Sequence, residues 1–237
     1  MRKFCPLLLT VLLASSLPAQ EPSERDCVVL LHGVAMSNWI MRPIAQVLER
    51  EGYRVVNLSH PSRSMPIEQI AGEWLPAELR AHGVERAPRV HFVVHSMGGL
   101  ITRLFLRDHR PRNLGRVVML GPPNHGSAAA DRAKTNALIR WIMGQNLARL
   151  GTGDDSVAAR LGPADFEVGI IAGSSHLNPL FDDDLQGEHD GVVTTESAKL
   201  EGMRDFIVLP HSHTVMLWRG AVHAQIVAFL RDGKFQR

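Results

Sequence analysis

Ser96 is the residue of this sequence best placed to act as a nucleophile. It stands in "VVHSMGG" (93–99), directly after an apolar run and directly before a predicted helix. A serine at such a strand-turn-helix junction is held exposed on a strained turn, the geometry that a nucleophilic serine requires. The full pattern is Gly-x-Ser-x-Gly, and here Val94 replaces the first glycine while Gly98 keeps the second. The strand beside Val94 is therefore expected to leave room for its side chain.

A serine hydroxyl becomes reactive when a histidine accepts its proton and a carboxylate orients that histidine. Asp190 in "EHDGVVTTES" lies on a long connection after a predicted strand, and His213 in "LPHSHT" lies between the last strand and the last helix. This order favours Ser96 as nucleophile, Asp190 as acid and His213 as base. His211 remains an alternative base. The three aspartates at 182–184 remain an alternative acid, a solvated loop or a calcium-binding run.

Two backbone N–H groups are needed to stabilise the negative charge that develops on a carbonyl oxygen under attack. We expect one from Met97, the residue after the serine. The other is expected from Val34 in "LLHGVAMSNW", which follows the first predicted strand. Gly33 would let this backbone approach a substrate closely. His32 is expected to orient the loop by a hydrogen bond, with a solvent-exposed side chain as the alternative.

Three large apolar residues, Met36, Trp39 and Trp141, are predicted to line a cleft for an acyl chain. Trp141 belongs to "ALIRWIMGQNLARL" (137–150), which lies between the predicted strands 116–120 and 166–172. Its apolar residues could line a ligand pocket, but the same pattern is equally consistent with a helix packed in the core.

The fold is predicted from alternating strand-like and helix-like segments in a chain that is 45% hydrophobic and 21% charged. Short continuous apolar runs indicate strands buried on both faces, so we expect one α/β domain over residues 27–232, with a mostly parallel sheet covered by helices on both faces. The predicted strands are 28–31, 53–58, 89–95, 116–120, 166–172 and 205–209. The main predicted helices are 40–50, 67–81 with a break at Pro76, 100–108 and 221–231.

Residues 1–20 resemble an export signal, because Arg2 and Lys3 precede a short apolar run that ends before Pro18-Ala19-Gln20. The run is shorter than a spanning helix needs, although an uncleaved anchor remains an alternative. We therefore expect a secreted chain, periplasmic or extracellular, or one anchored to the membrane if the signal is retained. Cys27 would then be the only cysteine, so no internal disulfide is expected.

Removal of the signal peptide also changes the charge. The whole chain has 26 basic and 24 acidic residues, a net charge of +2. Loss of Arg2 and Lys3 leaves 24 of each, so the basic character gives no reason to expect a nucleic acid partner.

Taken together, "LLHGVAMSNW", "HSMGG", "LGPPNHGS", "HDGVVTTES" and "LPHSHT" resemble the compact lipase and esterase branch of the α/β-hydrolase superfamily. The likeness runs from Cys27 to Leu230 and extends to predicted lipase/acyltransferase proteins. It implies a minimal α/β-hydrolase fold and a catalytic triad of Ser96, Asp190 and His213. It also implies cleavage of lipid-like or medium acyl esters through an acyl-enzyme.

The expected partner is a small-molecule or lipid ester, with transient contact to a lipid surface as a further expectation. No cofactor is expected, and no metal, because the sequence contains neither His-Glu-x-x-His nor a cysteine pair. Two other functions remain open. An acyltransferase would use the same acyl-enzyme, and a binding protein would keep the fold without catalysis.

Overall fold

The computed structural model describes residues 24–176 and 183–237. The expected export signal (1–20) and the first of the three aspartates, Asp182, lie outside the described residues. Within residues 24–176 and 183–237, no helix is long and apolar enough to cross a membrane.

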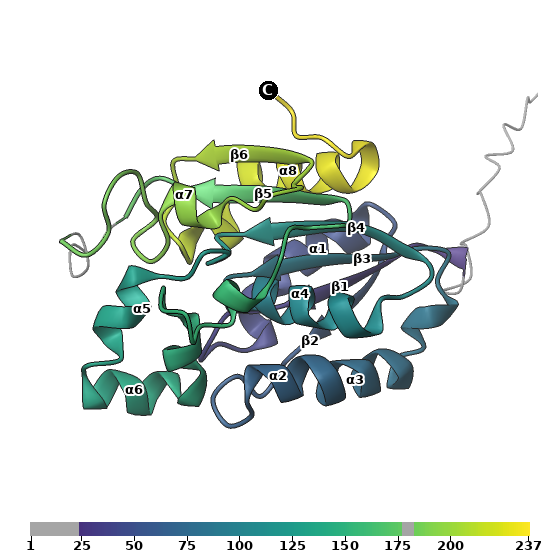
Figure 1. Ribbon diagram of the computed structural model, residues 1–237. Coiled ribbons are helices and arrows are strands. Elements are labelled where there is room, and N and C mark those ends of the chain that lie inside the picture. Colours follow the sequence, from purple (N-terminus) through teal and green to yellow (C-terminus); the bar gives the residue numbers. More distant parts are fainter. Residues whose placement is uncertain (1–23, 177–182) are drawn as a thin grey trace, which may run out of the picture.

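A six-stranded parallel sheet forms the centre of the protein (Figure 1). Its strands are β1 (Cys27–Leu31), β2 (Arg54–Leu58), β3 (Val90–His95), β4 (Leu114–Leu120), β5 (Val168–Gly173) and β6 (Asp205–Leu209), in the order β2-β1-β3-β4-β5-β6. Each predicted strand is present, with bounds that differ by at most two residues. The predicted α/β fold with a parallel sheet is therefore confirmed.

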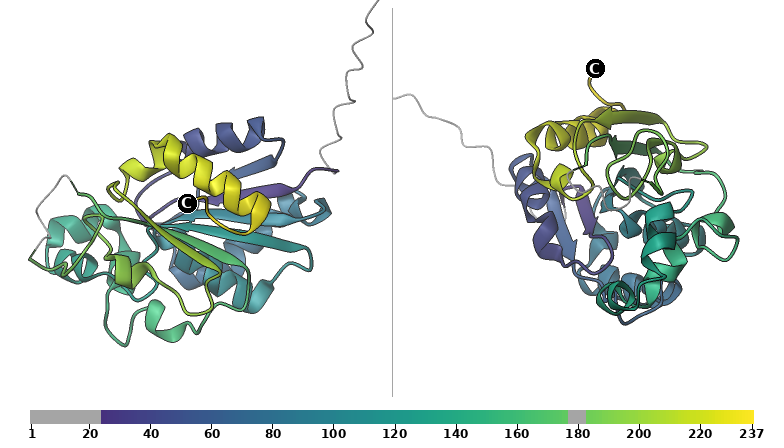
Figure 2. Two further views of the ribbon diagram at one scale, coloured as in Figure 1. Left: turned by 90° about the horizontal axis from the view of Figure 1, so that it is seen from above. Right: turned by 90° about the vertical axis from the view of Figure 1, so that its left-hand side faces the viewer.

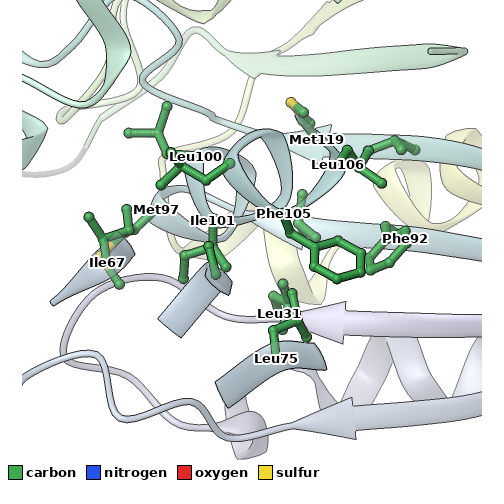
Figure 3. Packing of buried hydrophobic residues seen from close by; sticks show 14 of the residues in the cluster. Leu31, Ile67, Leu75, Phe92, Met97, Leu100, Ile101, Phe105, Leu106 and Met119 are labelled. Carbon is green, nitrogen blue, oxygen red and sulfur yellow. The ribbon is translucent and has the colours of Figure 1, made fainter. Parts of the chain in front are cut away.

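Helices cover both faces of the sheet (Figure 2). On one face α1 (Arg42–Arg50) and α8 (Gly220–Asp232) pack against side chains such as Val28, Leu30 and Val93. On the other face α4 (Met97–His109) packs with Leu31 and Phe92, together with α2 (Ile67–Gln69) and α3 (Leu75–Ala81) (Figure 3). Strands that are buried on both faces favour apolar residues at successive positions, which is why β1 is a continuous apolar run and β3 is apolar except at His91 and His95.

The predicted break near Pro76 appears as a wide helical turn. Residues Ile70–Trp74 form a π-helical turn between α2 and α3. Proline has no N–H to donate to the carbonyl four residues earlier, so the regular α-helical pattern cannot continue through it.

The remaining elements are short. They are α5 (Ala128–Ala133), α6 (Ala137–Met143), α7 (Thr195–Ala198) and the 3₁₀ turns Asn38–Met41, Val84–Arg86, Gln145–Leu150, Ala158–Arg160 and Val215–Trp218. In Figure 1, α5 and α6 lie beyond the carboxyl ends of the strands. No residue of α6 is buried, so the alternative of a core helix is wrong for this segment. Within residues 137–150, the apolar side chains that are buried, Leu147 and Leu150, belong to the 3₁₀ turn Gln145–Leu150 that follows α6.

The order of the strands places two loops side by side. β1 is paired with β2 on one side and with β3 on the other, so the chain runs from β1 to β2 and then crosses back past β1 to β3. Such a point opens a crevice at the carboxyl ends of the strands, where parallel α/β sheets bind ligands. Leu31 is level with Val94 in the β1–β3 pair, so the loop after β1 emerges beside Ser96.

Candidate active site

Ser96 occupies a strained turn between β3 and α4. Its backbone angles are φ 53° and ψ −122°, a conformation that side-chain-bearing residues adopt only where the surrounding structure enforces it. The Ser96 N–H donates to the carbonyl of Leu120, at 2.9 Å. A Cβ at Gly98 would stand 2.7 Å from the carbonyl oxygen of Leu31, so this position requires glycine. Val94 is fully buried in the core shared with α4, so its bulk is accommodated.

Asp190 and His213 form a buried pair. His213 Nδ1 lies 2.7 Å from Asp190 Oδ2. The other oxygen, Oδ1, accepts the N–H groups of Val192 and Val193 at 3.0 and 2.8 Å. These three hydrogen bonds hold the carboxylate in place, and its Oδ2 accepts from His213 Nδ1, which orients the imidazole ring with Nε2 directed away from Asp190.

The structure brings Ser96, Asp190 and His213 to the carboxyl ends of β3, β5 and β6. Ser96 and His213 line the same cavity. Asp190 pairs with His213, whereas His211 does not line this cavity. Asp183 is exposed, and among the described side chains no cluster of three or more histidines, cysteines or acids could hold a metal ion.

Two glycines that the sequence analysis did not assign make room for the Asp190–His213 pair. Gly173 ends β5, and a Cβ there would stand 2.2 Å from the carbonyl oxygen of His211 and 2.7 Å from Asp190 Cβ. Gly121 follows β4 and lies against the pair in the same way. Gly121 begins the "GPPNHGS" motif, so its place after a strand was the only available sign of its role.

Val34 and Met97, the predicted oxyanion donors, both lie near Ser96. Val34 lines the cavity, and Met97 is the first residue of α4, whose N–H has no acceptor within the helix. The loop that contains Gly33 packs closely against the turn that holds Ser96, because a Cβ at Gly33 would stand 3.2 Å from Ser96 Cβ. In the described part of the chain, neither of the two N–H groups donates a hydrogen bond to protein.

Three buried histidines, His32, His60 and His95, lie next to the loops that form this site. Burial lowers the pKa of His32, lowers the pKa of His60 to about 3, and lowers the pKa of His95 well below its usual value. The three rings are therefore neutral at neutral pH. His95 Nε2 donates to the carbonyl of His213 at 2.9 Å, and this bond connects the turn of Ser96 to the loop that contains His213. His32 Nδ1 lies 2.7 Å from the carbonyl oxygen of Gly33, the orienting contact expected for His32.

The cavity has a volume of about 420 Å³ and a mostly apolar wall. Its wall comes from α5, α6, the turn after α6 and the loop of Asp190. The lining residues are Val34, Met36, Ser96, Pro123, Ser127, Ala129, Ala130, Ala133, Ile139, Ile142, Met143, Leu147, Leu150, Val192, Val193, His213 and Thr214. An apolar ligand group is what such a wall can bury.

Of the three predicted cleft residues, the structure places only Met36 in this cavity. Trp39 and Trp141 are 66% and 72% exposed, so their assignment to the cleft is wrong. The reason lies in the helical period. Ile139, Ile142 and Met143 share the face of α6 that meets the cavity, and Trp141 lies on the opposite face. In the turn that holds Trp39, the buried residue is Met41.

Comparison with family models identifies the class of protein. Residues 28–228 match the model described as the alpha/beta hydrolase family. This match covers most of the chain, and the chain therefore belongs to that family.

Solved structures with the same fold include several lipases and esterases. A lipase of Bacillus licheniformis, BlEst2 in its mature form, is 23% identical with a TM-score of 0.68, covering 89% of this chain and 92% of that one. The phospholipase PlaB of Legionella pneumophila is 21% identical with a TM-score of 0.65, covering 79% of this chain and 52% of that one. The carboxylesterase CesB of Bacillus subtilis is 16% identical with a TM-score of 0.53, covering 88% and 84%. At these identities the likeness establishes the fold. Comparison with curated protein sequences gives no match.

Proposed function

We propose that this protein is a serine hydrolase of carboxylic esters that works through an acyl-enzyme on Ser96. The observation that carries the proposal is the meeting of Ser96 and the Asp190–His213 pair at one apolar cavity. Ser96 Oγ attacks the ester carbonyl while His213 Nε2 accepts its proton. The N–H groups of Val34 and Met97 stabilise the oxyanion. The alcohol leaves with the proton from His213, and water then releases the acid in the same way.

The acyl side of the substrate is proposed to be lipid-like or of medium length. The cavity wall is apolar along α5 and along the inward face of α6. Ser127 and Thr214 are the polar lining residues besides Ser96 and His213. Ser127 is itself occupied, because its hydroxyl donates to the carbonyl of Val192 at 2.6 Å. The wall therefore favours a hydrocarbon chain over a charged or sugar-like acid.

The test is covalent labelling by a fluorophosphonate, measured by intact mass. An activated serine displaces fluoride and adds one phosphonyl group per chain. We expect stoichiometric labelling of the wild-type protein and loss of labelling in Ser96→Ala and His213→Ala. If a well-folded wild-type protein is not labelled, the triad is not active and the protein would be a binding protein on the hydrolase fold.

Hydrolysis and acyl transfer diverge only after the acyl-enzyme has formed. The outcome depends on whether water or an alcohol reaches the acyl-enzyme. We propose hydrolysis as the main reaction. Product analysis in the presence of an added acceptor alcohol tests this, and a dominant transfer product would reassign the protein as an acyltransferase.

We also propose that α6 makes transient contact with an anionic lipid surface. Leu138, Trp141 and Ile142 are 64%, 72% and 45% exposed on this short helix beside the cavity. The guanidinium of Arg63 lies 5.9 Å from the centre of the Trp141 ring, and its Nη2 donates to the Trp141 carbonyl. Residues 137–143 of α6 contain Arg140 and no acidic residue. Apolar side chains next to cations suit a negatively charged lipid headgroup layer.

Cosedimentation with vesicles tests this contact. We expect binding to phosphatidylcholine vesicles that contain phosphatidylglycerol, weak binding to phosphatidylcholine alone, and a clear loss in Trp141→Ser. Trp218→Ser is the matched control, because Trp218 is an exposed tryptophan outside α6. Equal losses in the two variants, or no preference for the anionic vesicles, would contradict a role for α6.

Export is proposed from the sequence of residues 1–20. Expression of the full chain in a secreting bacterial host, followed by N-terminal sequencing, tests it. A mature protein that begins after residue 20 supports cleavage. A full-length chain in the membrane fraction would favour the anchor instead.

A further inference from the structure

The loop after β2 contacts the loop after β1 at two points. We call residues 32–35 the oxyanion loop and residues 60–62 the clamp loop. β1 and β2 run side by side with Leu31 level with Leu58, so the two loops leave the sheet together. His60 Nε2 donates to the carbonyl of His32 at 2.9 Å. The N–H of Ala35 donates to Ser62 Oγ at 3.0 Å. The two contacts bracket Gly33 and Val34.

His60 also stacks on His32. The ring centres are 3.9 Å apart and the planes differ by 12°. The exposed fractions of His60 and His32 are only 3% and 0%. Both rings are neutral at neutral pH because burial lowers their pKa values. A carbonyl can only accept, so the hydrogen bonds assign the proton to Nε2 of His60 and to Nδ1 of His32.

This arrangement controls the orientation of one peptide. The carbonyl of Gly33 and the N–H of Val34 belong to the same rigid plane. His32 Nδ1 donates to that carbonyl at 2.7 Å, so the position of the His32 ring fixes the direction of the Val34 N–H. A hydrogen bond to the carbonyl also polarises the peptide, which strengthens its N–H as a donor.

Ser62 secures the other end of the oxyanion loop. Ala35 has φ 55°, and in the described chain only Ser96 shares a positive φ among residues other than glycine. Such a conformation persists where neighbouring contacts enforce it, and the bond to Ser62 Oγ is such a contact. The clamp loop is itself anchored, because Asn146 Nδ2 donates to the carbonyls of Ser62 and Met65 at 2.7 and 2.8 Å.

We propose that His60 and Ser62 are positioning residues for oxyanion stabilisation, acting through His32 and Ala35. The proposal rests on the proposed function. Neither residue lines the cavity, so neither touches the acyl group. Their contribution appears when the carbonyl oxygen becomes negatively charged, and it therefore acts on kcat rather than on KM.

The experiment compares His60→Phe, His60→Gln and Ser62→Ala. Phenylalanine keeps a ring on His32 and removes the donor, whereas glutamine restores an N–H close to the position of His60 Nε2. Active sites are counted by fluorophosphonate labelling, and kcat and KM are measured with a medium-chain p-nitrophenyl ester. Affinity for a trifluoromethyl ketone is measured as well, because its adduct with serine carries the oxyanion. His91→Phe is the control, since His91 is equally buried but lies near the amino end of β3.

We expect His60→Phe to lower kcat by about 10- to 100-fold, less than or equal to the loss of a whole oxyanion donor, with KM nearly unchanged. The affinity for the ketone should fall by a similar factor. His60→Gln should recover most of kcat, and Ser62→Ala should lower kcat by about 5-fold or more. His91→Phe should lower the Tm while kcat per labelled site stays at the wild-type level.

Unchanged kcat in His60→Phe and Ser62→Ala would overturn the proposal. So would a loss of kcat without weaker ketone binding, or a loss that His60→Gln shares in full. If His60→Phe does not fold, His60→Gln and Ser62→Ala still decide, since Ser62→Ala must then lower both kcat and ketone affinity. An unlabelled wild-type protein is a separate result, because it removes the proposed function and this proposal together.

Discussion

Gly121 lies directly against the hydrogen bond between Asp190 and His213. A Cβ at this position would stand 2.9 Å from Asp190 Oδ2 and 3.0 Å from His213 Nδ1. Gly121 also has φ +52°, and its N–H donates to the carbonyl of Ile171 at 2.9 Å. The end of β4 is therefore fixed in place, and the acid–base pair occupies the space that a side chain would fill.

Gly121→Ala is expected to lower kcat by about 100-fold, because the new methyl group displaces the pair from its working position. The positive φ adds a loss of about 1 kcal/mol in the free energy of unfolding. Gly52→Ala is the matched control, since Gly52 has φ +89° and nothing within 4 Å of a built Cβ. It should lose similar stability and keep full kcat. Equal kcat in the two variants, measured per labelled active site, would show that the contact at Gly121 is harmless.

Ala130→Phe is expected to shorten the acyl chains that the enzyme accepts. Ala130 lies on α5 and lines the cavity, so a phenyl ring there occupies space that a long chain needs. We expect kcat/KM for a decanoyl ester to fall by about 10-fold or more while that for an acetyl ester stays close to wild type. Ala128→Phe is the control, because Ala128 is on the same helix but does not line the cavity. A p-nitrophenyl ester series gives the profile, and an unshifted profile in Ala130→Phe would place the acyl chain elsewhere.

The sequence was sufficient for features that have a local pattern. The strands are mostly apolar runs, and the turn of Ser96 is a short motif at the end of a strand, so both could be located without knowing what they contact. Trp141 shows where such reasoning fails. Its size and apolar character suggested a cleft residue, but α6 turns Ile139, Ile142 and Met143 towards the cavity and Trp141 to the opposite side.

The clamp loop was not predictable for a different reason. His60 contacts a residue 28 positions away, and Asn146 contacts Ser62 from 84 positions away. No periodicity or motif encodes such pairs, because they depend on which loops the strand order brings together. The role of Gly121 depends in the same way on side chains that come from β5 and β6.

Arg103 is a buried cation that forms no ion pair with an acid among the described residues. It projects from α4 with 5% of its surface exposed, and burial lowers the pKa of its guanidinium to about 10. Its N–H groups donate to the carbonyl and Oδ1 of Asn124 and to the carbonyls of Leu161 and Gly162, at 2.9 to 3.2 Å. These bonds join α4 to the loops after β4 and before β5.

Arg103→Met should lower the free energy of unfolding by about 3 kcal/mol, because it leaves buried acceptors without donors. Activity of the folded protein should persist, since Arg103 does not line the cavity. Arg107→Met is the control, because Arg107 is exposed and pairs with the adjacent Asp108, a contact that contributes less than about 1 kcal/mol. Urea unfolding measures both, and equal stability of the two variants would refute the structural role of Arg103.

The buried histidines make stability depend on pH. The pKa of His60 falls from 6.5 to about 3 on folding, mainly through burial and also through the neighbouring His32 ring. Below about pH 6.5 the unfolded chain binds a proton at this site that the folded chain does not bind. The free energy of unfolding therefore decreases as the pH falls from 6.5 towards 3, and it is unaffected by this group above that range. His32 and His95 act in the same direction, because burial lowers their pKa values too.

His60→Gln removes one of these titrating groups and is expected to flatten the pH dependence of stability. A single histidine contributes at most about 1.4 kcal/mol per pH unit, so the slope between pH 6 and pH 4.5 should decrease by up to about that amount. His82→Gln is the control for replacing an exposed histidine by glutamine, since the His82 side chain is 46% exposed. Urea unfolding at several pH values gives the slopes. If wild type and His60→Gln lose stability in parallel on acidification, folding does not lower the pKa of His60, and the neutral state assigned to its buried ring would have to be abandoned.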